Sequence, residues 1–143
     1  MKEANEDIFD IEGRQKRFAY VNRKAPYGTI YALEVLEVIM ISAAFEQAAV
    51  IAFIDDGVYQ ILKGQDTEAV GIKNFSRTYG AIEMEKKDIE EDEDLDIVWR
   101  IVVEQESLER RCLSADDFVV DVEVLTAAEL GELLNEQDVV LTA

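Results

Sequence analysis

Hydrophobic and polar positions alternate along this chain in blocks that predict strands separated by helices. Short runs rich in β-branched and aromatic residues, such as VIAFI at residues 50–54, predict buried strands. Longer stretches with apolar residues three or four positions apart predict helices. The predicted strands are residues 18–23, 48–55, 97–103, 118–124 and 139–142. The predicted helices are residues 29–45, 57–62, 72–81, 107–112 and 126–135, the last with a capping box of Thr126 and Glu129.

Strands that alternate with helices are typical of a parallel sheet covered on both faces, with right-handed crossovers. We therefore expect an α/β fold, namely a flavodoxin-like three-layer α/β/α domain with a five-stranded, mainly parallel sheet in the order 2-1-3-4-5. The length of 143 residues fits one domain, and we place it at residues 16–143. Residues 1–15 are polar and acidic and are expected to be a flexible tail. Residues 11–14 (IEGR) match a protease site used in recombinant expression, which a cloning remnant or chance explains equally well.

A second acidic segment, residues 83–96, is expected to be a solvated loop, because nine carboxylates and two lysines cannot pack. Its Asp92, Asp94 and Asp96 imitate the start of a calcium loop. The sixth and twelfth positions of that pattern hold Ile97 and Val103 in place of glycine and glutamate, which argues against a calcium site.

The predicted helix at residues 29–45 is more apolar than a helix that covers a sheet needs to be. Only Glu34, Glu37 and Ser42 interrupt its apolar character. A helix with one buried side shows a charged opposite face. Either the helix is buried all round, or a second face packs against another subunit, and we favour the subunit.

Composition narrows the classes of partner and place. A hydrophobic fraction of 49% with one proline indicates a globular chain. The net charge of −18 argues against direct binding of nucleic acid and of anionic membranes. The start of the chain is acidic where an export signal is basic and then apolar, and Glu37, Glu46 and Gln47 interrupt the most apolar region. We therefore expect a cytoplasmic protein, and a single cysteine fits a reducing compartment.

In the predicted strand order a ligand would bind at the carboxyl ends of the strands, between the first and third strands. The loop after the first strand and residues Glu104 and Gln105 would line this crevice. The first loop is basic, and its Arg23 and Lys24 are as suited to a neighbouring chain as to an anionic substrate. The residues predicted at this crevice or at an interface beside it are Asn22, Arg23, Lys24, Pro26, Tyr27, Gly28, Asp55, Asp56, Gly57 and Tyr59.

Candidate chemistry in the chain is sparse. There is no histidine, which excludes Ser-His and Cys-His pairs and His-bearing metal sites. No glycine-rich nucleotide motif is present, and no cofactor or metal is expected. Asp55 and Asp56 precede a glycine, a common turn pattern, and their side chains are expected to diverge. Cys112 follows a short helix whose negative dipole end disfavours a thiolate, so a non-catalytic cysteine is the favoured interpretation.

Five blocks of sequence resemble the DsrF/TusC branch of the DsrE/DsrF-like sulfur-relay family. They are VNRKAPYGTIYALEVLEV (21–38), FIDDGVYQILKGQDT (53–67), KNFSRTYG (73–80), SLERRCLSADDFVV (107–120) and NEQDVVLTA (135–143). The resemblance covers residues 17–143. It implies a flavodoxin-like fold in a heterohexamer with two copies each of DsrE-like, DsrF-like and DsrH-like subunits. In this family the DsrE-like and DsrH-like subunits carry a persulfide on a cysteine, and the complex passes sulfur to a DsrC/TusE-like carrier.

The resemblance also bears on what this chain does. The position of the family's cysteine falls close to Glu104, and a carboxylate cannot store sulfur as a persulfide. The chain is therefore expected to be a non-catalytic subunit, in intracellular sulfur oxidation rather than in the TusC-like alternative, which supplies sulfur for 2-thiouridine in tRNA. Two hypotheses of other classes stay open: a sulfurtransferase that uses Cys112, and a flavin or nucleotide binder by analogy of fold.

Overall fold

The computed structural model describes residues 16–44, 48–71, 74, 76–91 and 99–143, and in this part of the chain five parallel strands form one sheet. The strands are β1 (Phe18–Asn22), β2 (Ala49–Phe53), β3 (Trp99–Glu104), β4 (Glu123–Leu125) and β5 (Val139–Thr142). The α-helices are α2 (Tyr31–Ala44), α3 (Ser76–Glu91), α4 (Gln105–Arg111) and α5 (Ala127–Asn135). Three short 3₁₀ helices complete the set: η1 (Asp55–Ile61), η2 (Glu68–Val70) and η3 (Ala115–Asp117). Residues 1–15, the predicted tail, lie outside the described part.

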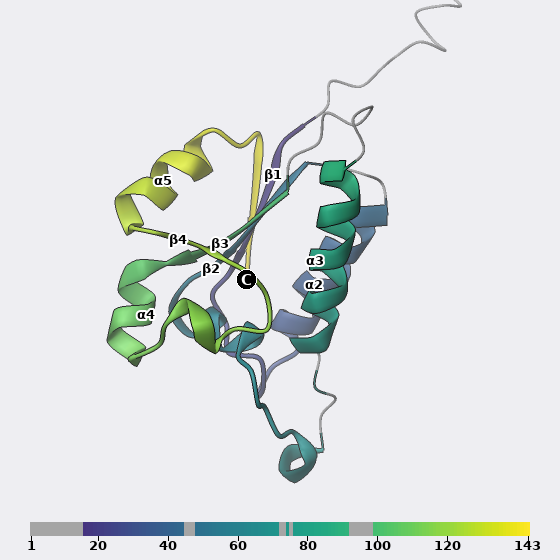
Figure 1. The fold of residues 1–143 in the computed structure, drawn as a ribbon, viewed down its shortest axis with the longest axis vertical. Helices are drawn as coiled ribbons and strands as arrows, with labels where there is room; N and C mark the ends of the chain where they lie inside the picture. The colour runs from purple at the N-terminus through teal and green to yellow at the C-terminus, as the bar shows by residue number, and fades with distance from the viewer. Residues whose placement is uncertain (1–15, 45–47, 72–73, 75, 92–98) are drawn as a thin grey trace, which may run out of the picture.

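The predicted fold class, a five-stranded parallel sheet between two layers of helices, is confirmed (Figure 1). The strand order is β4-β3-β2-β1-β5, which corrects the expected order 2-1-3-4-5. The chain builds β1 to β4 in one direction across the sheet, and α5 then carries it back to place β5 outside β1. As a result β2 lies between β1 and β3.

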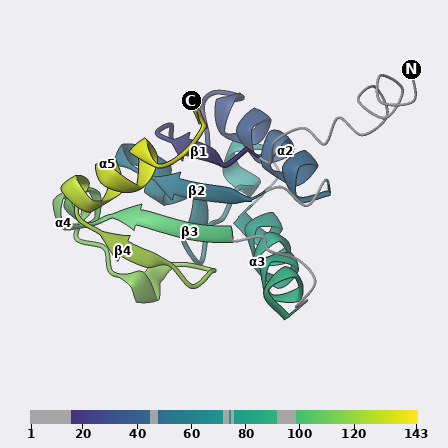
Figure 2. The same cartoon turned by 90° about the horizontal axis from the view of Figure 1, so that it is seen from above.

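Each face of the sheet packs against its own layer. On one face the aromatic side chains of Tyr20, Phe53 and Trp99 pack with residues of α2, α3 and η1. On the other face the small and β-branched residues of the central strands meet Leu130 and Leu133 of α5. Figure 2 shows α2 and α3 on one side of the strands and α5 on the other. All five residues of β2 are buried, as expected for a central strand covered on both faces.

The acidic segment 83–96 is not a loop over its first part, because α3 continues to Glu91. This is a correction, and the predicted helix 72–81 likewise begins later, at Ser76. Glutamate and lysine are good helix formers, and the helix pairs Lys87 with Glu83 at 3.3 Å. Glu83 also accepts a hydrogen bond from the backbone N–H of Asp121 (3.0 Å). Residues 92–96 fall outside the described part.

The predicted strand 118–124 is also corrected. Only residues 123–125 pair with β3, while Phe118 and Val120 are buried in the core as irregular chain. This apolar run hydrogen-bonds to the end of η1 and not to a strand, through the Val119 N–H and the Ile61 carbonyl (2.8 Å). Strand-like composition here reflects burial, because β propensity measures how a side chain packs as much as backbone preference.

Candidate functional site

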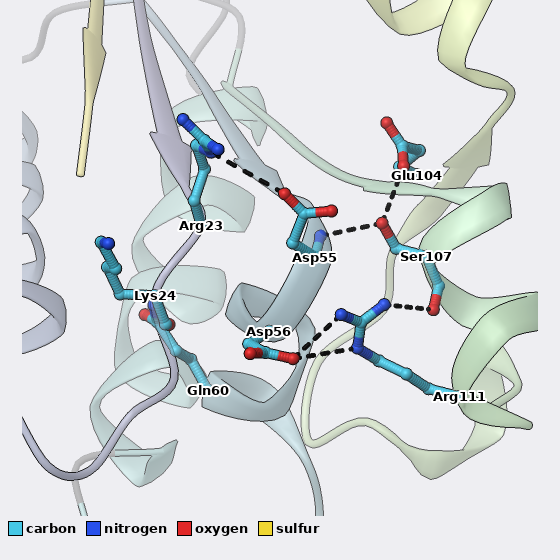
Figure 3. A network of polar contacts seen from close by, with 8 residues as sticks. All are labelled: Arg23, Lys24, Asp55, Asp56, Gln60, Glu104, Ser107 and Arg111. Carbon is cyan, nitrogen blue, oxygen red and sulfur yellow. Dashed lines mark hydrogen bonds and ion pairs between the residues drawn. The ribbon is translucent and has the colours of Figure 1, made fainter.

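The candidate site lies where β1, β2 and β3 end at one edge of the sheet. Asn22 is in register with Phe53, and Phe53 with Val103, so the segments after the three strands lie side by side. Since β2 is the middle strand, the first turn of η1 lies between the loop after β1 and the start of α4 (Figure 3). The crevice between the first and third strands that the predicted order requires is therefore occupied by η1.

Close packing of η1 on β1 depends on Gly57. A Cβ atom at this position would lie 1.9 Å from the carbonyl oxygen of Asn22. That oxygen already accepts a hydrogen bond from the N–H of Ile54 (3.1 Å). Asn22 is fully buried, and its amide donates to the carbonyl of Ala52 (3.3 Å). Asn22 and Gly57 thus hold the framework of the site and are not open to a ligand.

Asp55 and Asp56 diverge, as predicted, and each faces a different arginine. Asp55 lies 3.8 Å from Arg23 in an exposed ion pair. Asp56 accepts from Nη2 of Arg111 at 2.9 Å and from Nε at 3.3 Å. Arg111 also donates to the carbonyl of Ser107 (3.1 Å) and lies over the ring of Tyr59, 5.8 Å from its centroid. Arg111 is therefore held by three partners, whereas Arg23 is loosely held.

Glu104 takes part in a hydrogen-bonded chain that closes the end of β3. The Ser107 hydroxyl donates to Oε1 of Glu104 (2.8 Å) and accepts from the backbone N–H of Asp55 (2.8 Å). Ser107 is fully buried, and Asp55 has a left-handed backbone with φ of 50°. The carboxylate thus orients the hydroxyl that supports this turn, and Figure 3 shows Ser107 connecting the other two residues. An acceptor-only group in this place supports structure and offers no nucleophile for sulfur.

Cys112 lies away from this cluster. It is the C-cap of α4, eight residues after Glu104, and the helix separates the two by roughly 12 Å at about 1.5 Å per residue. Its side chain is exposed and its backbone is left-handed, with φ of 53°. Arg110 and Arg111 precede it, but Arg111 is already paired with Asp56. The chain has no histidine that could activate this thiol.

The rest of the loop after β1 is bound to the framework. The carbonyl of Lys24 accepts from the buried side chain of Gln60 (2.8 Å), and Pro26 is buried. Tyr27 donates its hydroxyl to Gln65, and burial raises the pKa of Tyr27. Gly28 has φ of 97°, a conformation that favours glycine. These contacts leave the side chains of Arg23 and Lys24 exposed at the surface of the loop.

Sequence reasoning missed the residues that connect the predicted ones. Ser107 follows Glu104 by three positions, a spacing that brings two side chains together at the start of a helix, so this contact was readable in principle. Arg111, Gln60 and Gln65 had no such signal. Their partners come from other segments of the chain, and only the fold brings them together.

The sequence of the chain identifies its protein family. Residues 16–143 match the sequence profile of the DsrE/DsrF-like family, and the chain belongs to this family. It is 46% identical over 141 residues to the intracellular sulfur oxidation protein DsrF of Allochromatium vinosum, covering 89% of this chain and 96% of that one. It is 29% identical to a TusC homolog of Vibrio vulnificus, with 83% and 92% covered.

A solved structure supports the fold. The ychN protein of E. coli superposes with a TM-score of 0.68 at 21% identity, covering 90% of this chain and 99% of that one. In the described part of the chain no helix is long and apolar enough to cross a bilayer, and no group of three metal-ligating side chains comes together.

Proposed function

We propose that this chain is a non-catalytic subunit of a cytoplasmic sulfur-relay complex in intracellular sulfur oxidation. In this role it supports persulfide transfer from a DsrE-like subunit to a DsrC-like carrier. Its partners would be DsrE-like and DsrH-like subunits, in a heterohexamer with two copies of each of the three chains. The net charge of −18 makes other proteins, and not nucleic acid or anionic membranes, the expected contacts.

The greater similarity to a sulfur oxidation protein favours the oxidative branch. Identity is 46% to that protein and 29% to the TusC homolog. The family fold by itself does not separate these two roles, because one fold supports many functions. We therefore place the subunit in sulfur oxidation, with the tRNA-thiolation complex as the alternative.

The observation that carries the non-catalytic role is Glu104 in its contact with Ser107. Persulfide transfer needs a thiolate that attacks a sulfane sulfur; the sulfur–sulfur bond of the donor breaks and the donor leaves as a thiolate. At the carboxyl end of β3 this chain has a carboxylate whose oxygen is already occupied by the Ser107 hydroxyl at 2.8 Å. The site is built as a support, and sulfur would pass through a partner's cysteine.

A second candidate is a sulfurtransferase that uses Cys112, favoured by the exposure of its thiol. The two candidates separate in one experiment. The complex of this chain with its DsrE-like and DsrH-like partners is loaded from a small-molecule persulfide, and transfer to the DsrC-like carrier is followed by mass spectrometry. We expect Cys112→Ser in this chain to leave the rate of transfer unchanged.

The isolated chain provides the matching control. Acceptance of one sulfur atom would add about 32 Da to the protein, and we expect no stable adduct that can be passed on. A wild-type chain that loads sulfur and hands it to the carrier, with the activity lost in Cys112→Ser, would make this chain a sulfurtransferase in its own right.

A further inference from the structure

The outer side of α2 is apolar, and no described residue of the chain covers it. Its inner side buries Ala32, Leu36 and Ile39 against the sheet. Val35 is half-buried, and the other large apolar side chains of the helix are 41–58% exposed. Leu141 of β5, on the same face of the sheet as Tyr20, is 44% exposed. We call these residues the α2–β5 surface: Tyr31, Leu33, Val38, Met40, Ile41 and Leu141.

A groove of about 200 Å³ lies within this surface, between α2 and β5. Glu34, Val35 and Val38 of α2 line one side, Leu141 and Thr142 line the other, and Tyr20 also lines the groove. The Tyr20 hydroxyl is hydrogen-bonded to Ser42, so it does not require a hydrogen bond from a group that enters the groove. The groove is thus suited to one apolar side chain of a partner.

The strand beside this groove is an edge strand of the sheet. Among the residues that the structure describes, β5 pairs with β1 alone. The N–H groups of Val139 and Ala143 bond toward β1, so the alternate backbone groups, those of Val140 and Thr142, face outward. Proteins commonly protect such edges with charged residues or proline. β5 (VVLT) has neither, whereas β4 at the other edge carries Glu123 in an ion pair with Arg100.

Charge decides between a second copy and a different chain. The charged residues of α2 are Glu34 and Glu37, both exposed, and within the described part of the chain neither meets a cation. Two copies that pack through this surface would bring these carboxylates together, and each copy carries −18. Like charges at an interface cost several kcal/mol. This cost favours a partner chain that carries positive charge opposite Glu34 and Glu37.

We propose that the α2–β5 surface binds a different protein chain, which inserts an apolar side chain into the groove and surrounds it with lysine or arginine facing Glu34 and Glu37. The inference rests on the proposed function, because the partners there are separate subunits. It goes further in naming the surface and the chemistry of the chain that covers it.

The test uses the complete chain co-expressed with its DsrE-like and DsrH-like partners. Val38→Asp introduces a charge at the groove and should weaken the complex about 30-fold or more, as expected for an unpaired charge buried in an interface. Ile41→Asp is a second variant. Because Ile41 is 58% exposed in the isolated chain, a charge there should weaken binding without disturbing folding. Glu34→Lys with Glu37→Lys should also weaken the complex, most strongly at low salt.

Val124→Asp is the matched control. Val124 is 40% exposed and Val38 is 41% exposed, but Val124 lies on β4, at the opposite edge of the sheet. We expect this variant to bind its partners as the wild type does, and circular dichroism shows whether each variant is folded.

The possible outcomes separate the two proposals. If wild type binds its partners and the three α2 variants bind equally well, the surface assignment is wrong while the proposed function stands. If wild type binds neither partner, both fail. An isolated wild-type dimer that Val38→Asp converts to a monomer would identify the occupant as a second copy and overturn the charge argument.

Discussion

At the scale of single residues, the site at the strand ends is held by contacts that leave little freedom. Ser107 connects Glu104 to the backbone of Asp55, and Gly57 lets η1 approach β1 at a distance no side chain permits. A site that must bind and release a ligand needs open, reachable groups. At this site Ser107 and Glu104 hydrogen-bond within the protein, which fits a supporting role.

Gly57→Ala should therefore strongly destabilise the protein. The added Cβ would lie 1.9 Å from the Asn22 carbonyl oxygen, and backbone on both sides has to move, at a cost of about 3 kcal/mol or more in the free energy of unfolding. Urea unfolding measures this. Gly80→Ala in α3 is the control, because nothing lies within 4 Å of its Cβ position and alanine in a helix is up to about 1 kcal/mol more stable than glycine. Equal stabilities of the two variants would contradict the packing described at η1.

At the scale of elements, β4 is the least secure part of the sheet. It has three residues, and within the described part of the chain it pairs only with β3. A bidentate contact from Arg100 on β3 to Glu123 on β4, at 2.9 and 2.8 Å, fastens it. The hydrogen bond from Arg100 lowers the pKa of Glu123, an effect that outweighs the opposing effect of burial.

This contact makes a pH-dependent contribution to stability. A carboxyl whose pKa is lowered by folding stabilises the folded state above its unfolded pKa of 4.5, and the contribution is lost as the pH falls through the lower folded value. Wild type should thus exceed Glu123→Gln in unfolding free energy at about pH 7, and the difference should disappear toward about pH 3. Urea titrations across this range provide the measurement. Glu132→Gln, at an exposed carboxylate of α5 with no ion pair among the described residues, is the control. A difference that is independent of pH would contradict the assignment.

At the scale of the whole molecule, charge is the dominant feature. Thirty-two acidic and 14 basic residues give a net charge of −18. In the folded chain the negatively charged side chains repel one another, and burial of the apolar core opposes this repulsion. The same charge discourages the chain from meeting copies of itself, although α2 exposes an apolar surface. The negative charge and the exposed apolar face of α2 together fit a subunit that binds a different protein chain.

Added salt should raise the thermal stability of the isolated chain. Screening weakens repulsion between exposed carboxylates, and the few exposed ion pairs lose less than the repulsion does. We expect the melting temperature to rise between about 0.02 M and about 0.2 M sodium chloride, followed by circular dichroism. An uncharged osmolyte at equal osmolarity controls for effects unrelated to charge. A falling melting temperature would show that ion pairs, and not repulsion, dominate.

How far sequence reasoning reached differs between fold and site. Alternating apolar runs were sufficient to predict the α/β class and four of the strands, because burial on two faces imposes a visible composition. The strand predicted at residues 118–124 is correct only at residues 123–124, which belong to β4, because an apolar run shows burial without showing its hydrogen-bond partner. The loop predicted at residues 83–96 is wrong over residues 83–91, which belong to α3, because a run of charged residues by itself does not distinguish a loop from a helix.

The sequence by itself determined the class of fold, the excess of apolar residues on α2, the lack of histidine and the carboxylate at the end of β3, since each is a property of residue type and local spacing. Only the tertiary structure decided that β2 lies between β1 and β3, that Arg111 holds Asp56, and that Ser107 joins Glu104 to Asp55. Apart from the contact between Ser107 and Glu104, these contacts join residues far apart in the chain. The physical reason is that strand order depends on which face of the sheet each connecting helix covers. That choice depends on how the layers of the whole domain pack, and a local sequence pattern does not contain this information.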